Sequence, residues 1–192
     1  MRIVGGKHRG RRIEAPPGLD VRPTSDRARE ALFNILTHGH LSADGTSPLT
    51  GARVLDAFAG SGALGLEALS RGAAHALFIE NDAKACAAIR ANAKSLGETA
   101  NVTVIPGDAT RPPPCPGARC DIVLLDPPYS RDLAAPALAA LAARGWIAEG
   151  AVCLVELAIN DGITLPPGFT LLDDRRYGKA RLLVLRYLSA EP

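Results

Sequence analysis

The segment Asp126-Pro127-Pro128-Tyr129 combines two hydrogen-bond acceptors with an aromatic ring. Proline fixes φ and has no backbone N–H, so the Asp126 carboxylate and the Pro127 carbonyl can face a ligand without competing donors. These two acceptors could hold both N–H groups of an exocyclic base amine and direct its lone pair at an electrophilic methyl group. Tyr129 could stack on the base, a contact worth roughly 1–3 kcal/mol. The tetrapeptide, although Pro-Pro also occurs in ordinary turns, predicts a reaction centre that methylates an amine by positioning it.

A glycine-rich segment precedes the tetrapeptide. Gly60, Gly62 and Gly65 form the pattern GxGxxG between an expected strand and an expected helix. This pattern brings the backbone and helix N–H groups close to a ligand, which can be a dinucleotide or S-adenosylmethionine. Asp56 lies before the glycines, where a carboxylate would repel a pyrophosphate but suit an ammonium and a sulfonium. We therefore expect S-adenosylmethionine to contact Asp56, Ala59, Gly60, Ser61 and Gly62.

Two more acids follow expected strands. Glu80, with Asn81 after it, ends the next strand, and its two oxygens could accept both hydroxyls of a ribose. Asp108, with Ala109 after it, follows the third strand and could accept a hydrogen bond from an adenine amino group. Acids are common in exposed loops. Three acids at three successive strand ends nevertheless favour a nucleoside cofactor.

The elements that must position these residues alternate from residue 52 onward. Apolar runs predict strands at 54–56, 76–79, 102–105, 122–125 and 152–156, and helices at 62–71, 83–96 and roughly 133–144. Repeated β-α-β units imply an α/β fold with a parallel sheet covered on both faces. Ligands bind such sheets beyond the carboxyl ends of the strands, where the acids lie. Two further strands, 169–174 and 181–188, are expected to form a hairpin that adds one antiparallel strand.

The first 40 residues differ from the rest in charge. The chain has 22 basic and 20 acidic residues, yet residues 1–12 contain basic residues and no acid. This distribution indicates either a polyanionic partner or a solvated terminus. We expect a β-hairpin at 2–15 and an amphipathic helix from 26 to about 37, which together form an RNA-binding extension (1–40) of a catalytic domain (41–192). The predicted RNA contacts are Lys7, Arg9, Arg11 and Arg12, called here the basic arm, together with Arg22.

Composition excludes several other classes. A hydrophobic fraction of 47% and a charged fraction of 22% fit a globular protein. The longest apolar run, 133–143, contains a proline and is shorter than the roughly 20 residues of a membrane span. The N-terminus lacks a signal-peptide core, so we expect a cytoplasmic protein. The four cysteines match no zinc spacing, and we expect no metal.

With both motifs in place, the chain resembles the RsmD family of 16S rRNA guanine-N(2) methyltransferases over almost its whole length. The resemblance is carried by Arg2-Ile3-Val4-Gly5-Gly6-Lys7, Arg9-Gly10-Arg11, Arg22-Pro23-Thr24-Ser25-Asp26-Arg27, Arg29-Glu30, Leu32-Phe33-Asn34, the run from Asp56 to Gly72, and Asp126-Pro127-Pro128-Tyr129. It implies a class I S-adenosylmethionine-dependent methyltransferase fold (Rossmann-like) with a seven-stranded, mostly parallel sheet. It also implies a guanine 2-amino acceptor in 16S rRNA of an assembled or partly assembled 30S subunit. The proline-rich loop 110–119 departs from the family.

Three alternatives stay open. The tetrapeptide is also typical of adenine-N6 methyltransferases of DNA or RNA, although a chain this small has no separate DNA-recognition domain. The glycine pattern fits a nicotinamide-dependent oxidoreductase. The basic arm fits a non-catalytic RNA-binding protein. Arg175, Arg176 and Tyr177 could line a substrate cleft or build a turn.

Overall fold

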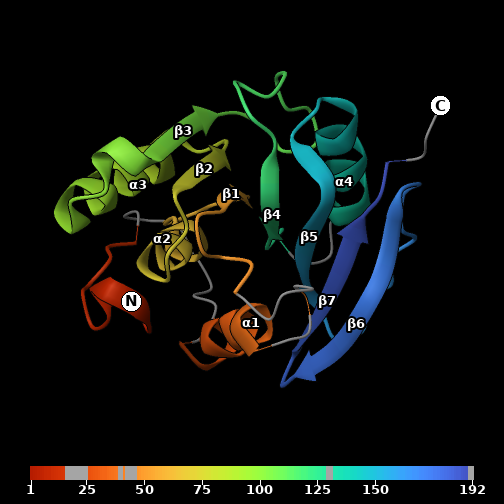
Figure 1. Cartoon of the computed structure of the whole chain (residues 1–192), viewed down its shortest axis with the longest axis horizontal. Coiled ribbons are helices and arrows are strands. Elements are labelled where there is room, and N and C mark those ends of the chain that lie inside the picture. The colour runs from red at the N-terminus through yellow and green to blue at the C-terminus, as the bar shows by residue number, and fades with distance from the viewer. Residues whose placement is uncertain (16–25, 39–40, 42–46, 129–131, 190–192) are drawn as a thin grey trace.

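A seven-stranded sheet forms the centre of the computed structural model, which describes residues 1–15, 26–38, 41, 47–128 and 132–189. The strand order is β3-β2-β1-β4-β5-β7-β6 (Figure 1). The strands are β1 (Arg53–Ala57), β2 (His75–Glu80), β3 (Val102–Pro106), β4 (Cys120–Leu125), β5 (Ile147–Ala158), β6 (Phe169–Tyr177) and β7 (Ala180–Tyr187). Five strands are parallel, and β7 is antiparallel to both β5 and β6. The predicted α/β fold with one antiparallel strand from a C-terminal hairpin is confirmed.

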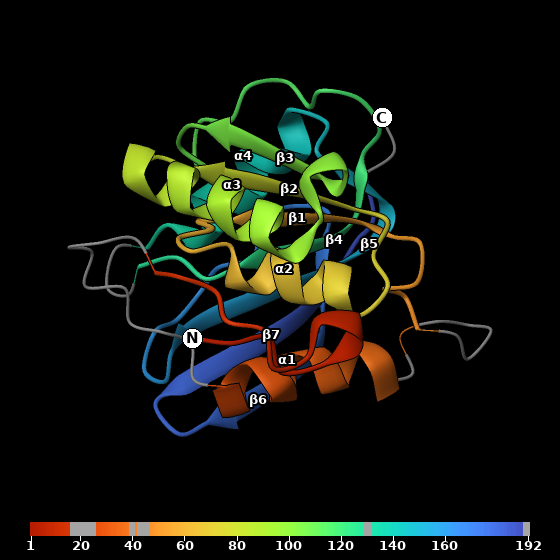
Figure 2. The same ribbon diagram turned by 90° about the vertical axis from the view of Figure 1, so that its left-hand side faces the viewer.

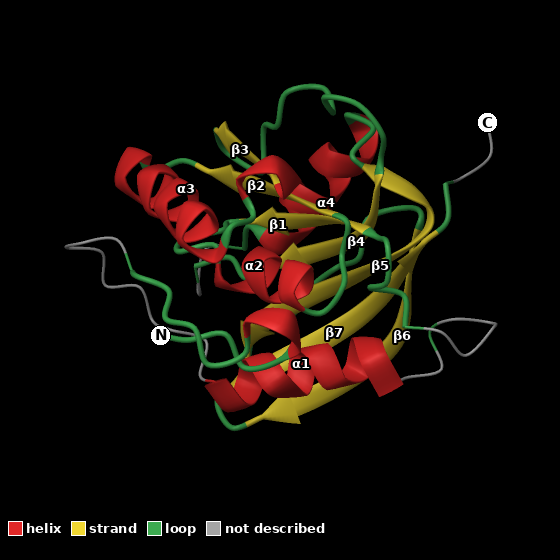
Figure 3. Cartoon of the chain, turned by 60° about the vertical axis from the view of Figure 1, so that its left-hand side comes forward, coloured by secondary structure: helices red, strands yellow, loops and turns green. Residues whose placement is uncertain are grey.

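Helices cover both faces of this sheet. The helices α1 (Asp26–His38), α2 (Ala63–Ser70) and α3 (Ala83–Leu96) lie on one face and α4 (Ala134–Ala143) lies on the other (Figures 2 and 3). Each face has its own apolar core, because neighbouring strand residues such as Leu124 and Leu125 point to opposite sides. The predicted helices agree within one residue at each end. Pro136 is the third residue of α4, where a helix tolerates proline.

The strand order reverses at the centre of the sheet. The chain passes from β1 outward to β2 and β3, and then returns to place β4 on the other side of β1. The carboxyl ends of β1 and β4 therefore flank the point at which open α/β sheets bind their ligands. This topology sets the glycine-rich segment after β1 beside the segment that follows β4.

Strand β5 is longer than predicted. It begins at Ile147, whereas the apolar run predicted a start at residue 152. The register between β4 and β5 shifts between Cys120 and Ile122, and Gly150 adopts a φ of +76°. The first part of β5 was not predicted because a polar residue and Gly150 interrupt the apolar run that identifies a buried strand.

The N-terminal segment is only partly the predicted hairpin. Arg2 and Arg12 form an isolated antiparallel bridge, and the short 3₁₀ helix η1 (Gly6–His8) closes the loop between them. Two regular strands do not form here, because the amides of Val4 and Gly5 bind the Glu67 carboxylate of α2 instead of a partner strand. The boundary between an N-terminal extension and a catalytic domain stays a prediction.

Two further findings concern the described residues alone. None of their helices is long and apolar enough to cross a membrane. No group of three histidine, cysteine or acidic side chains among them could hold a metal ion. A second short 3₁₀ helix, η2 (Thr99–Asn101), leads into β3.

Candidate functional site

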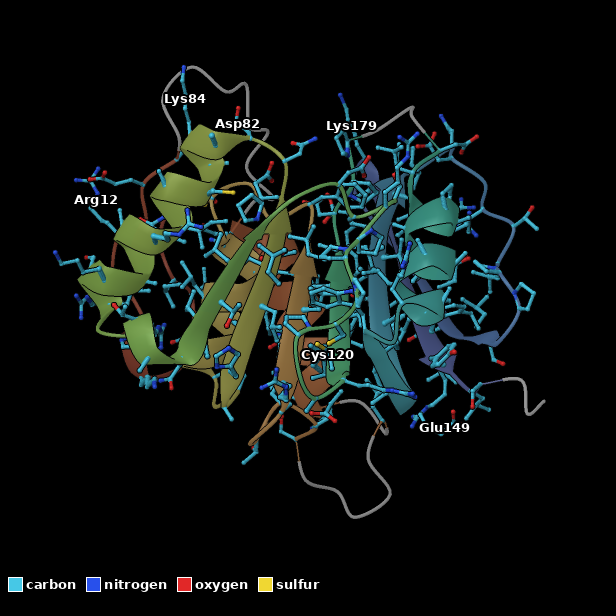
Figure 4. All side chains as sticks on the ribbon, turned by 90° about the horizontal axis from the view of Figure 1, so that it is seen from above. Arg12, Asp82, Lys84, Cys120, Glu149 and Lys179 are labelled. Carbon is cyan, nitrogen blue, oxygen red and sulfur yellow. The ribbon has the colours of Figure 1, made fainter. Side chains whose placement is uncertain are left out.

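Three of the predicted acids converge at one edge of the sheet. Asp56, Glu80 and Asp126 lie at the carboxyl ends of the adjacent strands β1, β2 and β4. Burial raises the pKa of Asp56 well above its usual value, and the negative charges of Asp126 and Glu80 raise it further. In Figure 4 the carboxyl ends of the strands lie on the side where Asp82 and Lys179 are labelled, and the label of Glu149 marks the opposite side. The sequence prediction that these acids share one region is consistent with their mutual electrostatic effect.

The segment after β1 has the backbone of a tight ligand-binding turn. Gly60 and Gly62 have φ values of +54° and +78°, which favour glycine. Phe58 has a φ of +65°, an uncommon conformation for a residue with a side chain, and strain of this kind clusters at functional sites. Gly65 is required for another reason, because a Cβ there would overlap the ring of Phe78. The three glycines thus shape the turn and let α2 approach β2.

The side chain of Asp56 forms a hydrogen bond with the residues that follow this turn. Its carboxylate accepts a hydrogen bond of 2.8 Å from the Gly65 amide, and the side chain is only 1% exposed. One of the helix amides that we expected to face a ligand therefore binds Asp56. A buried carboxylate with two acidic neighbours is best stabilised in its ionised form by a cation. The site therefore fits a cofactor that carries an ammonium and a sulfonium.

The other residues predicted to contact the cofactor differ in their exposure and in their hydrogen bonds. Glu80 accepts hydrogen bonds from the Gly60 and Asp82 amides at 2.7 and 2.8 Å, so its carboxylate is held in place beside the turn. Asp108 is exposed beyond β3, and hydrogen bonds from the Thr110 amide and hydroxyl lower its pKa. Asn81 is exposed, whereas Ala59, Ser61, Gly62 and Ala109 are buried. Whether each contacts the cofactor stays a prediction.

A cavity adjoins the start of the tetrapeptide. Asp126 is half-buried, Pro127 is buried and Pro128 is exposed, and both prolines line a cavity of about 540 Å³. Other parts of its wall come from the start of α4, from Glu156 at the end of β5 and from residues 161–164. This volume lies within the range of roughly 300–1,000 Å³ for small-ligand sites. Tyr129 lies outside the described residues.

The basic arm is partly bound to the body of the protein. Lys7 forms an ion pair of 2.7 Å with Glu98, and the Arg11 guanidinium donates a hydrogen bond to the Ser95 carbonyl. Arg9 and Arg12 are exposed, and Figure 4 shows Arg12 beside α3. Arg22 lies outside the described residues. An RNA contact through Lys7 would have to compete with its ion pair.

Glu98 is the acid that holds the arm at α3. It is 3% exposed and also binds His8 at 2.6 Å and Asn101 at 2.7 Å. Burial opposes its ionisation, but hydrogen bonds from Lys7, Asn101 and His8 outweigh burial and lower its pKa to about 2. Glu98 is therefore an ionised anchor for the start of the chain.

Two buried polar residues connect the N-terminal segment to the site, and sequence analysis assigned neither of them a role. Glu67 of α2 accepts hydrogen bonds of 2.8 Å from the Val4 and Gly5 amides. Asn92 of α3 donates to the carbonyls of Glu14 and Ser61, so it joins the N-terminal segment to the glycine turn. A polar residue on the buried face of a helix was the available signal for both.

Arg175, Arg176 and Tyr177 lie on β6, the edge strand next to β7. Arg175 pairs with Asp173 at 2.7 Å, and Tyr177 packs against the core on the α1 face. These residues extend β6 beyond the predicted end at residue 174.

Comparisons with known proteins identify the family of the chain. The family described as "Conserved hypothetical protein 95" matches residues 1–186. The chain is 37% identical over 180 residues to "Ribosomal RNA small subunit methyltransferase D" of Escherichia coli, which covers 93% of this chain and 86% of the relative. The protein of the same name from Haemophilus influenzae is 33% identical over 182 residues, with coverages of 93% and 89%. The chain belongs to this family. The predicted RsmD membership is confirmed, and the protein is an S-adenosylmethionine-dependent methyltransferase.

Solved structures support the same fold. The yhhF protein of Escherichia coli aligns with a TM-score of 0.80 and 36% identity over 98% of each chain. An RNA methyltransferase from Salinibacter ruber in complex with S-adenosyl-L-homocysteine aligns with a TM-score of 0.65 at 14% identity, covering 88% of this chain and 96% of that one. The latter likeness concerns the fold alone. The class I methyltransferase fold predicted for this RsmD-family protein is confirmed.

Proposed function

We propose that this protein transfers a methyl group from S-adenosylmethionine to the 2-amino group of a guanine in the RNA of the small ribosomal subunit. The observation that carries the proposal is the placement of Asp126 and Pro127 beside the glycine turn at the strand-order reversal. The names of the relatives that are 37% and 33% identical indicate ribosomal RNA as the substrate.

The residues of the chain position the two reactants. Bound S-adenosylmethionine supplies a methyl carbon that is electrophilic because its sulfur is positively charged. Asp56 would stabilise the positive charge of the cofactor, and Glu80 would accept hydrogen bonds from its ribose. The Asp126 carboxylate and the Pro127 carbonyl accept the two N–H groups of the base amine and leave its lone pair free to attack. When the amine takes the methyl group, S-adenosylhomocysteine is left as the neutral product, and the cationic amine, which the charge of Asp126 would stabilise, passes one proton to water.

The basic arm extends this site toward a larger RNA. All four members of the arm are exposed, and they are suited to phosphate contacts, which give affinity without base specificity. The N-terminal segment reaches the glycine turn through Asn92, so RNA held by the arm would lie beside the cofactor loop. We propose that the substrate is this RNA within an assembled or partly assembled 30S subunit. The test compares the rate of methylation of free 16S rRNA with that of isolated 30S subunits.

Nucleoside mass spectrometry of small-subunit RNA tests the function. RNA from a strain that lacks the protein should lose one N2-methylguanosine, and the wild-type gene should restore it. The Asp126→Ala variant should fail to restore it, whereas Asp121→Ala, the same change at the exposed opposite end of β4, should succeed. Loss of N6-methyladenosine alone would reject the guanine assignment. Calorimetry that shows binding of NADH but no binding of S-adenosylhomocysteine would reject the methyltransferase mechanism.

A further inference from the structure

Asp126-Pro127-Pro128 prepares an amine for methylation but does not distinguish guanine from adenine, because both bases carry an exocyclic amine. A buried acid, Glu156, lies next to this segment. It lies near the end of β5, before Leu157 and Ala158, and is 7% exposed. It is the last residue of the strand predicted at 152–156.

The strand register places Glu156 beside Asp126. Strands β4 and β5 are parallel, with Leu124 opposite Leu154 and Leu125 opposite Val155. Asp126 and Glu156 follow these pairs directly. Glu156 is therefore the β5 residue in register with Asp126, which follows β4 directly, and neighbouring strands lie roughly 4.8 Å apart.

The cavity beside them is suited to a base edge rich in hydrogen-bond donors. Glu156, Pro127 and Pro128 all line it, and its other acids are Asp132 and Asp161. Among its described lining residues there is no lysine, arginine or histidine, so these residues provide no basic side chain for a phosphate. The order β1-β4-β5 then assigns the cofactor to β1, the reacting amine to β4 and the rest of the base to β5.

Guanine and adenine differ at the ring position next to their amines. In guanine the 2-amino group is next to N1–H, which is a donor. In adenine the 6-amino group is next to N1 without hydrogen, which is an acceptor. Enzymes that act on an extruded base read this Watson–Crick edge. A carboxylate accepts the donor of guanine and repels the lone pair of adenine.

We infer that the Glu156 carboxylate accepts the N1–H of the target guanine and thereby excludes adenine from the cavity. This inference rests on the proposed function and adds to it the residue that selects the base. Asp126 holds the amine, and Glu156 holds the neighbouring ring nitrogen. The same tetrapeptide can then position the amine of guanine in this protein and the amine of adenine in other methyltransferases.

The test changes the target base and the Glu156 side chain separately. The methylated guanine is first mapped by mass spectrometry. Small-subunit RNA is then assembled from ligated pieces with either guanine or 2-aminopurine at that position. 2-Aminopurine keeps the 2-amino group, has an acceptor at N1 and lacks the 6-oxo group of guanine, so the variant proteins are needed to assign the preference to N1. Wild-type protein should methylate guanine with a kcat/KM about 10- to 100-fold higher, the factor expected for one hydrogen bond to a charged group.

The Glu156→Gln variant should reduce that preference at least about 10-fold, because a glutamine amide can donate to N1 of 2-aminopurine and removes the charge repulsion. Glu149→Gln makes the same change at the opposite end of β5 and should keep the wild-type preference. Asp161→Asn, which alters another acid of the cavity wall, should also keep it. Unchanged affinity for S-adenosylhomocysteine would show that the Glu156→Gln protein is folded.

Three results would overturn the inference. One is a wild-type protein that methylates 2-aminopurine as fast as guanine, a measurement that needs no variant. Another is a Glu156→Gln protein that slows both substrates equally. The third is a loss of preference in Asp161→Asn instead of Glu156→Gln. If wild-type protein formed no N2-methylguanosine at all, the proposed function itself would fail.

Discussion

Replacing Glu67 with alanine should release the N-terminal segment from the body of the protein. Glu67 is fully buried in α2, where its carboxylate accepts hydrogen bonds from the Val4 and Gly5 amides at 2.8 Å each. It also pairs with Arg71 at 2.7 Å. Residue 6 must be glycine for this docking, because its φ is +73° and a Cβ there would overlap the backbone carbonyl of Ser70, whereas a Cβ at Gly5 would meet only the end of the flexible Arg71 side chain.

The expected loss of stability follows from these three bonds. Each hydrogen bond to a charged group contributes about 1.5–3 kcal/mol, but bonds that share one acceptor are not additive. Removing one partner of a buried ion pair costs about 3–5 kcal/mol, which we take as the total for Glu67→Ala. For a protein of this size each kcal/mol lowers Tm by about 2–4 °C, so we expect a decrease of about 6–20 °C.

Thermal and urea denaturation measure this change, and hydrogen exchange locates it. The Val4 and Gly5 amides should exchange much faster in Glu67→Ala, and the KM for RNA should rise because the basic arm is no longer positioned. Glu30→Ala alters an exposed glutamate of α1 and should stay within about 0.5 kcal/mol of wild type. A Glu67→Ala protein as stable as this control, with slow exchange at Val4 and Gly5, would refute the docking described above.

Three further predictions concern the glycine turn, the Glu98 anchor and the basic arm. Gly65→Ala should destabilise the fold by about 1–3 kcal/mol through overlap with Phe78 and weaken S-adenosylhomocysteine binding; Gly107→Ala, where a Cβ meets open space, is the stability control. The pKa of Glu98 is lowered to about 2, so its stabilising effect should be complete above pH 4.5 and be lost as the pH falls toward 2. Urea titrations should show that Glu98→Gln flattens this dependence and Glu30→Gln does not; equal profiles would contradict the anchor. Replacing all four residues of the basic arm with alanine should flatten the slope of log affinity against log salt by about 3, whereas an unchanged slope would mean a solvated arm.

Local chemistry in the sequence determined the elements and their order. Continuous apolar runs predicted the central strands and a period of 3.6 predicted the amphipathic helix, because a parallel strand is buried on both faces and a surface helix on one. β-α-β repetition predicted the parallel sheet, and the acids at strand ends predicted one ligand-binding edge. The early start of β5 was missed because its glycine and polar residues interrupt the pattern at Gly150.

The tertiary structure decided which side chains of different helices and strands contact one another. The sequence predicted a carboxylate at Asp56 but not that it would be buried against the Gly65 amide of α2. It also could not predict that Glu67 would replace a partner strand for the N-terminal segment. Glu156 was visible as a strand residue, and only the register between β4 and β5 sets it beside Asp126. Periodicity assigns a side chain to a face of its own element, whereas contacts between elements depend on register, crossing and backbone conformation that arise only when the chain packs.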